Sequence, residues 1–598
     1  MAASNSPAEQ LITENIDIWT SAIKKRGSQG RGSSKKIELY GIKKLRELIL
    51  ELAVRGLLVP QDPNDESASV LLEKIAAEKE QLIKDGKIKK QKALLEISED
   101  EKPFELPNGW AWARLGDIGL IASSRRVQKK DWVTEGIPFY RAREIVKLSK
   151  DGKVKNDLFI TNEMYSELSK KGEVPEYNDI MITGVGTIGV PYKVRCDDKF
   201  YFKDASVLIF KNYFSITPDY LCLFMKTPYW KNTIHSSSMG TTVHTLTISR
   251  ANDVLIPVIP LTEVQSIVAK VDELMALCDQ LEQQTESSLS AHQTLVETLL
   301  NTLLNADQNS FDQAWERIAQ HFDVLFTTEH SIDQLKQTIL QLAVMGKLVP
   351  QDPNDEPASV LLEKIAAEKE QLIKDGKIKK QKALPEISED EKPFELPKGW
   401  EWVRLEALSH LITKGSSPKW QGVAYTENSE DILFVTSENV GTNCLLLDKK
   451  KYVEKHFNDV EPRSVLRKGD ILMNIVGGSI GRTAVFDIDA LANINQAVCL
   501  IRVFDEIIEK EYLLKFFNSE TCRGYMFDKQ VDNARANLSM GNISKFVIPL
   551  PPSTESPRIV EKVNGLLALC ETLKNYLRES QTTQLHLADA MAEQTLNS

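Results

Sequence analysis

Two long stretches of the chain carry apolar residues at the spacing of a coiled-coil helix. Between 261 and 304, core positions recur at alternating steps of four and three: Ile267, Val271, Leu274, Cys278, Leu281, Thr285, Ser288, His292, Leu295 and Leu299. This heptad spacing is typical of a helix that packs along its length against another helix. Residues 559–591 have the same spacing. We therefore predict two long helices that lie side by side.

Two other stretches, 110–259 and 400–551, have a different pattern. Short runs of β-forming residues are separated there by Gly, Asn and Asp turns, at 180–183, 206–210, 471–475 and 498–503. Each stretch also contains a short aromatic helical segment, at 220–225 and 512–517. These patterns predict two mixed α/β domains. Outside them, the spacing of Val70, Leu71, Ile75 and Leu82 predicts an amphipathic helix over 68–84.

One stretch of the chain is written twice. Residues 348–400 repeat 58–110, and only the pairs Ser67/Pro357, Leu95/Pro385 and Asn108/Lys398 differ. A period of 290 residues is too long for a solenoid and indicates that a whole half-molecule was duplicated. Residues 261–305 resemble the C-terminal tail, and 311–345 resemble the N-terminal part. This circular order indicates an internal pseudo-two-fold axis, so the two long helices should be antiparallel.

Length and composition favour a multidomain protein without a membrane segment. A chain of 598 residues exceeds the size of a single core. We find no signal peptide and no apolar run long enough to span a bilayer. The seven cysteines are scattered and form no CxxC pair, which favours a reduced, cytoplasmic protein without a cysteine-based zinc site. The N-terminal 57 residues are predicted to be helical, with a Gly/Ser/Lys/Arg loop at 24–36.

The distribution of charge matters more than its sum. The net charge is −11, which by itself argues against a nucleic-acid partner. Residues 110–259, however, contain 21 Lys and Arg against 16 Asp and Glu, a net of +5. Residues 400–551 contain 18 against 20, a net of −2. The acidity therefore lies mostly in the helical parts, and the first α/β domain permits DNA binding.

The sequence offers no convincing catalytic apparatus. Residues 184–189 match GxGxxG, but Pro191 and β-forming residues follow where a dinucleotide site needs a helix. We interpret this motif and its counterpart at 477–482 as glycine-rich connections between strands. Phosphate-binding loops and HExxH are missing from the sequence, and a literal GxSxG occurs at 477–481 as part of that glycine-rich counterpart. We predict a non-catalytic protein, and His292 is expected to be packed or hydrogen-bonded and not to bind a metal.

Several loops are rich in side chains that contact DNA. Arg and Lys pair with guanine or phosphate, Asn with adenine, and Ser and Thr with either kind of base. In the first domain the candidates are Ser124, Arg125, Arg126, Lys129, Lys130, Lys193, Arg195, Thr241, Thr242 and His244. In the second they are Lys414, Ser416, Ser417, Lys419, Arg482, Asn533, Arg535 and Asn537. Each cluster alone is also compatible with an ordinary polar loop, but the clusters recur in both domains.

The chain resembles the specificity subunit of type I restriction–modification enzymes. Each half has a Trp-x-Arg-Leu signature, at Trp112 to Leu115 and Trp402 to Leu405, preceded by Pro and Gly-Trp. Each also has an Asp-Ile pair followed by Gly-x-Ile-Gly, at 179–189 and 470–481. Each domain then leads through a β-run and prolines into a heptad helix. The resemblance covers nearly the whole chain.

The resemblance implies a fold and a division into domains. Two target-recognition domains of mixed α/β structure would be separated by an antiparallel coiled coil of long helices. The expected order is an N-terminal conserved helical region, a duplicated helix and linker, the first recognition domain, a central conserved helical region, the second duplicated segment, the second recognition domain and a C-terminal conserved helix. Their expected bounds are 1–57, 58–109, 110–260, 261–347, 348–399, 400–551 and 552–598.

The resemblance also implies partners. Each recognition domain would bind one half of a bipartite double-stranded DNA site with a non-specific spacer. Two methyltransferase subunits would modify adenines with S-adenosylmethionine, and two motor-nuclease subunits would use ATP and Mg²⁺, in the bacterial cytoplasm. This chain would itself hold no cofactor. A symmetric coiled-coil scaffold whose α/β domains bind proteins is the alternative.

Overall fold

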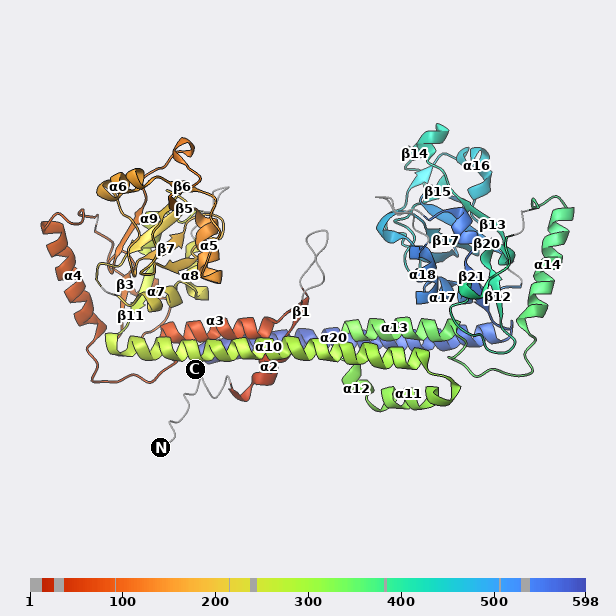
Figure 1. Ribbon diagram of the computed structural model, residues 1–598, viewed down its shortest axis with the longest axis horizontal. Helices are drawn as coiled ribbons and strands as arrows, with labels where there is room; N and C mark the ends of the chain where they lie inside the picture. Colours follow the sequence, from red (N-terminus) through yellow and green to blue (C-terminus); the bar gives the residue numbers. More distant parts are fainter. Residues whose placement is uncertain are drawn as a thin grey trace. The chain divides into compact units, whose positions relative to one another are not determined.

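The computed structural model describes residues 13–25, 37–91, 93–214, 216–236, 245–380, 384–504, 507–528 and 538–597. The chain divides into two compact units (Figure 1). Unit 1 comprises residues 1–288 and 580–598, and unit 2 comprises residues 289–579. Each unit combines one α/β domain with packed segments of long helices.

In unit 1, three helices share one apolar core. They are α3 (Tyr40–Arg55), the first part of α10 (Leu261–Asn305) and the last part of α20 (Glu555–Asn597). Leu45 and Leu52 of α3 lie in this core with Ile267 of α10 and with Ala588 and Ala592 of α20. Ion pairs add to it, since Arg46 meets Asp279 and Glu282, and Lys44 meets Asp589.

Unit 2 has the corresponding arrangement. Here α13 (Glu329–Val344) packs with the last part of α10 and the first part of α20. Val296 and Leu300 of α10 share the core with Ile559 and Val563 of α20. The start of α10 therefore packs with the end of α20 in unit 1, and the reverse holds in unit 2. The predicted antiparallel pairing is confirmed.

The predicted heptad positions of α10 are right in the first half of the helix and only partly right in the second, where Thr285, His292 and Leu299 are half-buried. All the predicted positions from Ile267 to Leu281 are buried, whereas Ser288 and Leu295 are exposed. The buried positions further along are Val296, Leu300 and Leu303. A straight α-helix has 3.6 residues per turn, so a strict heptad drifts around it by ~20° per repeat. Beyond Leu281 the buried positions are therefore displaced by one residue from the predicted series, since Val296 and Leu300 are buried where Leu295 and Leu299 were predicted.

The α/β domain of unit 1 is built on an antiparallel sheet with the order β4-β10-β7-β8. These strands are β4 (Leu120–Ser123), β10 (Val207–Lys211), β7 (Ile180–Thr183) and β8 (Pro191–Lys193). A smaller sheet orders β6 (Phe159–Ile160), β5 (Ile137–Tyr140) and β9 (Tyr201–Phe202), and β3 (Ala111–Arg114) pairs with β11 (Leu255–Val258). The described helices are α5 (Ala142–Asp151), α6 (Asn162–Lys171), α7 (Pro218–Phe224), α8 (Pro228–Ser236) and α9 (Ile248–Asp253).

The domain of unit 2 repeats this topology. Its main sheet has the order β13 (Ser409–Lys414), β20 (Val498–Val503), β17 (Asp470–Asn474) and β18 (Thr483–Phe486). A second sheet orders β14 (Tyr425–Thr426), β16 (Tyr452–Val453), β15 (Ile432–Val435) and β19 (Ala492–Ile494), and β12 (Glu401–Arg404) pairs with β21 (Val547–Leu550). The described helices are α15 (Leu405–Leu408), α16 (Phe457–Val460), α17 (Lys510–Phe517), α18 (Glu520–Asp528) and α19 (Met540–Ser544). The expected fold class, two mixed α/β domains with paired long helices, is confirmed.

Most local predictions hold. The predicted helix over 68–84 is α4 (Ala68–Lys84), and its duplicate is α14 (Ala358–Lys374). The four predicted β-runs are strands, two with the predicted bounds and two displaced by one residue. The N-terminal prediction needs a correction, because short paired strands β1 (Lys24–Lys25) and β2 (Ile37–Glu38) separate α2 (Ile16–Ser21) from α3. The loop between these strands, 26–36, lies outside the described residues.

The glycine motifs connect strands, as predicted. Residues 184–190 join β7 to the antiparallel β8, and Gly186 and Gly189 have φ of 70° and 80°. The counterpart joins β17 to β18 through Gly477 and Gly481, also at positive φ. Residues other than glycine rarely adopt a positive φ. The turn conformation therefore explains why glycines occur at these positions, and a bound dinucleotide is not needed to explain them.

The remaining expectations concern cysteine, histidine and membrane segments. All seven cysteines are free thiols. His292 Nε2 is 3.1 Å from the Val324 carbonyl oxygen, so this side chain is hydrogen-bonded as expected. Across the described ranges, none of the helices is both long and apolar enough to cross a membrane.

A buried hydrogen bond joins each α/β domain to its long helix. Trp110 Nε1 donates to Glu263 Oε2 in the first turn of α10 at 2.8 Å, and Trp400 Nε1 donates to Glu555 Oε2 in the first turn of α20 at 3.0 Å. Gln351, in the duplicated segment, also donates to Glu555, at 3.1 Å. Burial raises the pKa of both carboxyl groups, although the tryptophan hydrogen bonds act in the opposite direction.

A buried arginine closes the base of each domain. Arg114 donates to the carbonyls of Leu95 and Asp253 and pairs with Glu101. Arg404 makes the same contacts with Pro385, Lys545 and Glu391. The hydrogen bond from Arg404 lowers the pKa of Glu391 to about 2. The arginine of the Trp-x-Arg-Leu signature therefore ties the linker to the first and last strands of its domain.

We predict that removing the Glu555 carboxylate destabilises unit 2. In Glu555→Ala, Trp400 Nε1 and the Gln351 amide lose a buried acceptor, so the free energy of unfolding should fall by ~1–3 kcal/mol. Glu555→Gln retains an acceptor without the buried charge and should be better tolerated. Denaturant unfolding of the full chain measures the difference. The control is Glu561→Ala, an exposed position on the same helix, expected within ~0.5 kcal/mol of wild type.

The pH dependence separates the charge from the hydrogen bond. Because burial raises the pKa of Glu555, the folded state binds its proton more tightly than the unfolded state does. Its contribution to stability is thus fully present below the unfolded pKa, ~4.3, and is lost as the pH rises through the folded value. Stability of Glu555→Gln relative to wild type should therefore increase from acidic to neutral pH. A difference that stays constant with pH contradicts the charged, buried state.

Candidate nucleic-acid interface

The first candidate loop of unit 1 follows β4, at the edge of the main sheet. Arg126, Lys129 and Lys130 are exposed there, and within the described part of the chain none of them forms an ion pair. Ser124 is buried instead, and its hydroxyl donates to the Phe202 carbonyl at 2.7 Å. Arg125 donates from Nε to the Lys171 carbonyl at 3.2 Å. The loop thus has an internal anchor at Ser124 and an exposed cationic end.

The second group in unit 1 is already engaged within the domain. Lys193 on β8 pairs with Asp219 at 2.6 Å. Arg195 donates to the Gly152 carbonyl at 3.0 Å and lies over the Tyr192 ring. These contacts leave the two cations less free to meet a phosphate than Lys129 and Lys130. The third group, Thr241, Thr242 and His244, lies outside the described residues.

In unit 2, the corresponding loop follows β13. Lys414 and Lys419 are exposed, and Ser416 and Ser417 are half-buried between them. Ser416 Oγ accepts a hydrogen bond from Gln421 at 3.0 Å. Arg482 is exposed at the end of the β17–β18 connection. Asn533, Arg535 and Asn537 lie outside the described residues.

The candidate clusters recur in both domains, but among the described residues the structure makes only the first cluster of each domain equivalent. β4 and β13 occupy the same edge of equivalent sheets, and a short 3₁₀ helix follows each, η2 (Lys129–Asp131) and η4 (Pro418–Gln421). These two loops are equivalent. Lys193 and Arg195, however, lie at and after the end of β8, whereas Arg482 precedes the equivalent strand β18. They therefore belong to opposite ends of matching strands.

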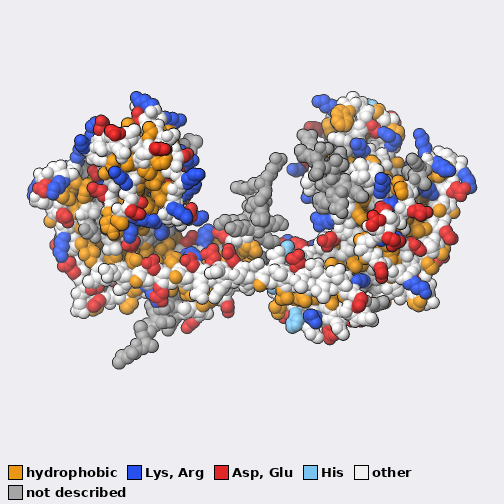
Figure 2. Space-filling view, viewed as in Figure 1, with side chains coloured by type: hydrophobic (Ala, Val, Ile, Leu, Met, Phe, Trp, Pro, Cys, Tyr) orange, Lys and Arg blue, Asp and Glu red, His pale blue; other side chains and the backbone are white. Residues whose placement is uncertain are grey.

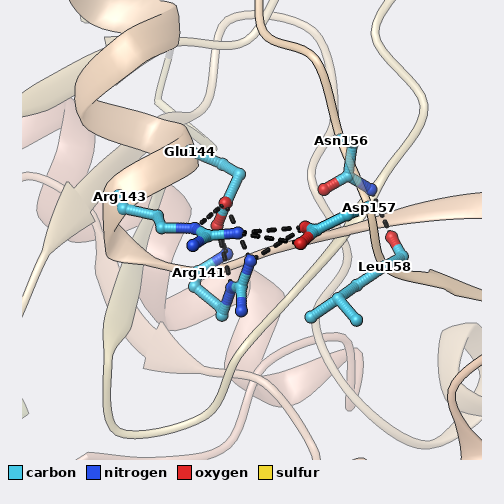
Figure 3. A network of polar contacts seen from close by, with 6 residues as sticks. All are labelled: Arg141, Arg143, Glu144, Asn156, Asp157 and Leu158. Atoms are coloured by element: carbon cyan, nitrogen blue, oxygen red, sulfur yellow. Dashed lines mark hydrogen bonds and ion pairs between the residues drawn. The ribbon is translucent and has the colours of Figure 1, made fainter.

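One charged network in unit 1 was not anticipated from the sequence (Figure 3). At the start of α5, Arg141 and Arg143 both bond to Glu144 and to Asp157, whose carboxylate lies 3.0 Å from each guanidinium. Burial alone raises the pKa of Glu144, but the two arginines outweigh it and hold the pKa below its ordinary value. Asp157 is far from the arginines in sequence and reaches them only in the folded domain. The local sequence pattern therefore could not predict this network. Its charges are balanced internally, and we do not count it among the DNA contacts.

The surface agrees with the charge count. Figure 2 shows Lys and Arg side chains scattered over the visible face of the unit 1 domain, among hydrophobic and acidic side chains. Groups of His, Cys, Asp and Glu able to hold a metal are not found among the described residues. The geometry thus offers paired, exposed cationic loops at matching sheet edges, which can bind a polyanion.

Comparison with known proteins decides the family. A family model described as "Type I restriction modification DNA specificity domain" matches the chain twice, over residues 107–291 and 397–580. The chain belongs to this family. The specificity subunit of the type I restriction enzyme EcoEI from Escherichia coli is 40% identical over 98% of this chain and 100% of its own length. That of EcoAI, also from Escherichia coli, is 39% identical over the same shares.

A solved structure is more distant. The HsdS subunit from Thermoanaerobacter tengcongensis has 19% sequence identity and a TM-score of 0.40, over 83% of this chain and 98% of its own. The assignment therefore rests on the family match and the two full-length relatives. This chain is a type I specificity subunit with two recognition domains. Each match to the family model starts just before the Trp that binds the buried glutamate and ends within a long helix.

Proposed function

We propose that each recognition domain binds one half of a bipartite DNA site and that the paired helices set the gap between the halves. The observation that carries this proposal is the contrast between the two domains. They share one topology and the same buried joints, but the loops at their equivalent sheet edges differ in sequence. Equal scaffolds with different loops suit two different base sequences on one duplex.

Within each domain, phosphate and base contacts should have separate roles. Arg126, Lys129 and Lys130 are exposed and unbalanced within the described structure, so they suit phosphates. In the second domain, the exposed candidates are Lys414, Lys419 and Arg482, and we assign them the same role. Base-specific hydrogen bonds would come from the same loops and from the untested candidates such as Arg535. Each good bidentate base contact contributes ~1–3 kcal/mol of discrimination.

The helices would dock the other subunits of the enzyme. The duplicated segments, including α4 and α14, offer two equivalent surfaces, which suits two copies each of a methyltransferase and a motor-nuclease subunit. S-adenosylmethionine, ATP and Mg²⁺ would act on those partners, and this chain would be non-catalytic. The relatives carry the name of specificity subunits of restriction enzymes, which supports the same division of labour. We expect the complex to act in the bacterial cytoplasm.

A modification map tests this function directly. Genomic DNA from a host with the intact gene should carry methyladenine at one bipartite motif with a constant gap, and a deletion strain should lack it. Loss of modification after deletion, restored by the gene on a plasmid, assigns the motif to this chain. An unchanged map, combined with protein partners recovered on the purified chain, would favour the alternative of a protein-binding scaffold.

We predict that Lys129→Ala/Lys130→Ala weakens DNA binding on every sequence alike. Two lost phosphate contacts should reduce the slope of log affinity against log salt by about two and leave the selected motif unchanged. Binding titrations at several salt concentrations measure this. Lys84→Ala/Lys87→Ala is the matched control in titrations of the chain without its partner subunits, because it removes the same charge from lysines that pair with Glu80 and Asp85. An unchanged slope in the first variant contradicts the phosphate assignment.

We predict that lengthening both long helices changes the preferred gap. Seven residues inserted after Ser288 in α10 and after Glu579 in α20 lengthen each helix by ~10 Å, about three base pairs of duplex. The motif selected from random duplexes should keep both halves and acquire a longer gap. A two-residue insertion in the exposed turn at Asn428 should leave the gap unchanged. If the long-helix variant selects the original gap, the helices do not set it.

A further inference from the structure

One tryptophan of the second α/β domain is exposed, on a surface loop. Trp420 lies in η4 and is 74% exposed. Tryptophan is usually well buried, because its large apolar ring gains much free energy from leaving water. Within the described residues, its ring stacks on no other aromatic side chain and its indole nitrogen has no hydrogen-bond partner. The core of the domain therefore does not explain this side chain.

The backbone that carries Trp420 is held firmly. A Cβ at Gly415 would lie 1.8 Å from the Ile494 carbonyl oxygen, so the loop approaches β19 as closely as only glycine allows. Pro418 is buried, and the Val423 N–H donates to its carbonyl at 3.0 Å. Gln421 donates to Ser416 Oγ at 3.0 Å and to Glu461 Oε1 at 2.8 Å. These contacts fix the loop backbone, so the position from which the indole extends is well defined.

The surroundings of the ring suit a nucleic acid. Lys414 and Lys419 are exposed on the same loop, and in the described part of the chain neither forms an ion pair. Tyr425 on β14 adds a second exposed ring, at 58%. Figure 2 shows exposed hydrophobic side chains on this domain where Figure 1 places β14. Exposed apolar rings on a loop with unpaired cations can contact base edges of a duplex while the cations neutralise phosphates.

The equivalent loop of unit 1 provides an internal comparison. Trp132 follows η2 there, but it is turned inward, half-buried against the Phe139 ring at 6.0 Å in the cluster that contains Val127. A tryptophan at this loop can therefore be accommodated by the domain. In unit 2 the ring remains outside although the loop is at the same sheet edge.

We propose that Trp420 makes apolar contact with the bases of the half-site bound by the second recognition domain and so determines part of its sequence. This inference rests on the proposed function, because it requires a duplex at the β13 edge. The ring would lie against a base edge or a base step while Lys414 and Lys419 hold the flanking phosphates. Apolar side chains contact thymine methyl groups or enter base steps in this way.

The test is selection from a pool of random duplexes, with the full chain in complex with its methyltransferase partner. Wild type, Trp420→Ala, Trp420→Phe and Trp132→Phe are compared. Trp420→Ala should keep one half of the motif and lose preference at one or two adjacent base pairs of the other. On the wild-type motif its affinity should fall about 10- to 100-fold, as expected for the loss of recognition at one base pair of a duplex site. Trp420→Phe should fall between, and Trp132→Phe should select the wild-type motif.

The outcomes are distinguishable. If wild type selects a bipartite motif and Trp420→Ala selects the same one, Trp420 is not a specificity residue and the proposed function stands. If wild type selects no motif, both proposals fail. Should Trp420→Ala select the wild-type motif but bind the methyltransferase subunit more weakly, the exposed ring is a protein contact and the DNA assignment is overturned. Thermal unfolding of Trp420→Ala should match wild type, because the side chain is outside the core.

Discussion

The structure depends on a buried tryptophan–glutamate hydrogen bond that occurs once in each unit. The indole N–H of Trp110 or Trp400 satisfies a carboxylate in the first turn of a long helix, where the helix dipole also favours negative charge. Removing one partner would leave the other buried and unpaired, at a cost of ~1–3 kcal/mol against a net value of ~0.5–1.5 kcal/mol for the bond. The bond therefore fixes how the α/β domain attaches to its helix.

The second constraint is the pairing of the first and last strands of each domain. β3 pairs with β11 and β12 with β21, and Arg114 and Arg404 tie the preceding linkers to the same place. Most of the sequence that differs between the two domains lies between these strands. The attachment is nearly identical in the two halves because 58–110 and 348–400 are nearly identical. The recognition surfaces can thus diverge in sequence while the attachment of each domain to its helices stays the same.

The sequence predicted the elements well and the side-chain environments less well. Periodicity found α4, the main strands and both long helices, because apolar spacing records burial directly. It was only partly right beyond Leu281, where Ser288 and Leu295 are exposed and the neighbouring Val296 is buried instead. Ser124 and Lys193 have the right chemistry for DNA but are used inside the domain, by Phe202 and Asp219. Trp420 was missed for the opposite reason. Its large apolar side chain is typical of a core residue, and only the folded structure shows that it is exposed to solvent.

The adjacency of the first and last strands has an evolutionary consequence. Because a recognition domain leaves the helices and returns to them at one place, its coding segment behaves as a module with compatible ends. A genetic exchange bounded by the signature arginine and the last strand would replace one half-site preference without disturbing helix pairing. New specificities in this architecture can therefore arise by recombination in a single step, and need not accumulate through a series of weakly selective intermediates.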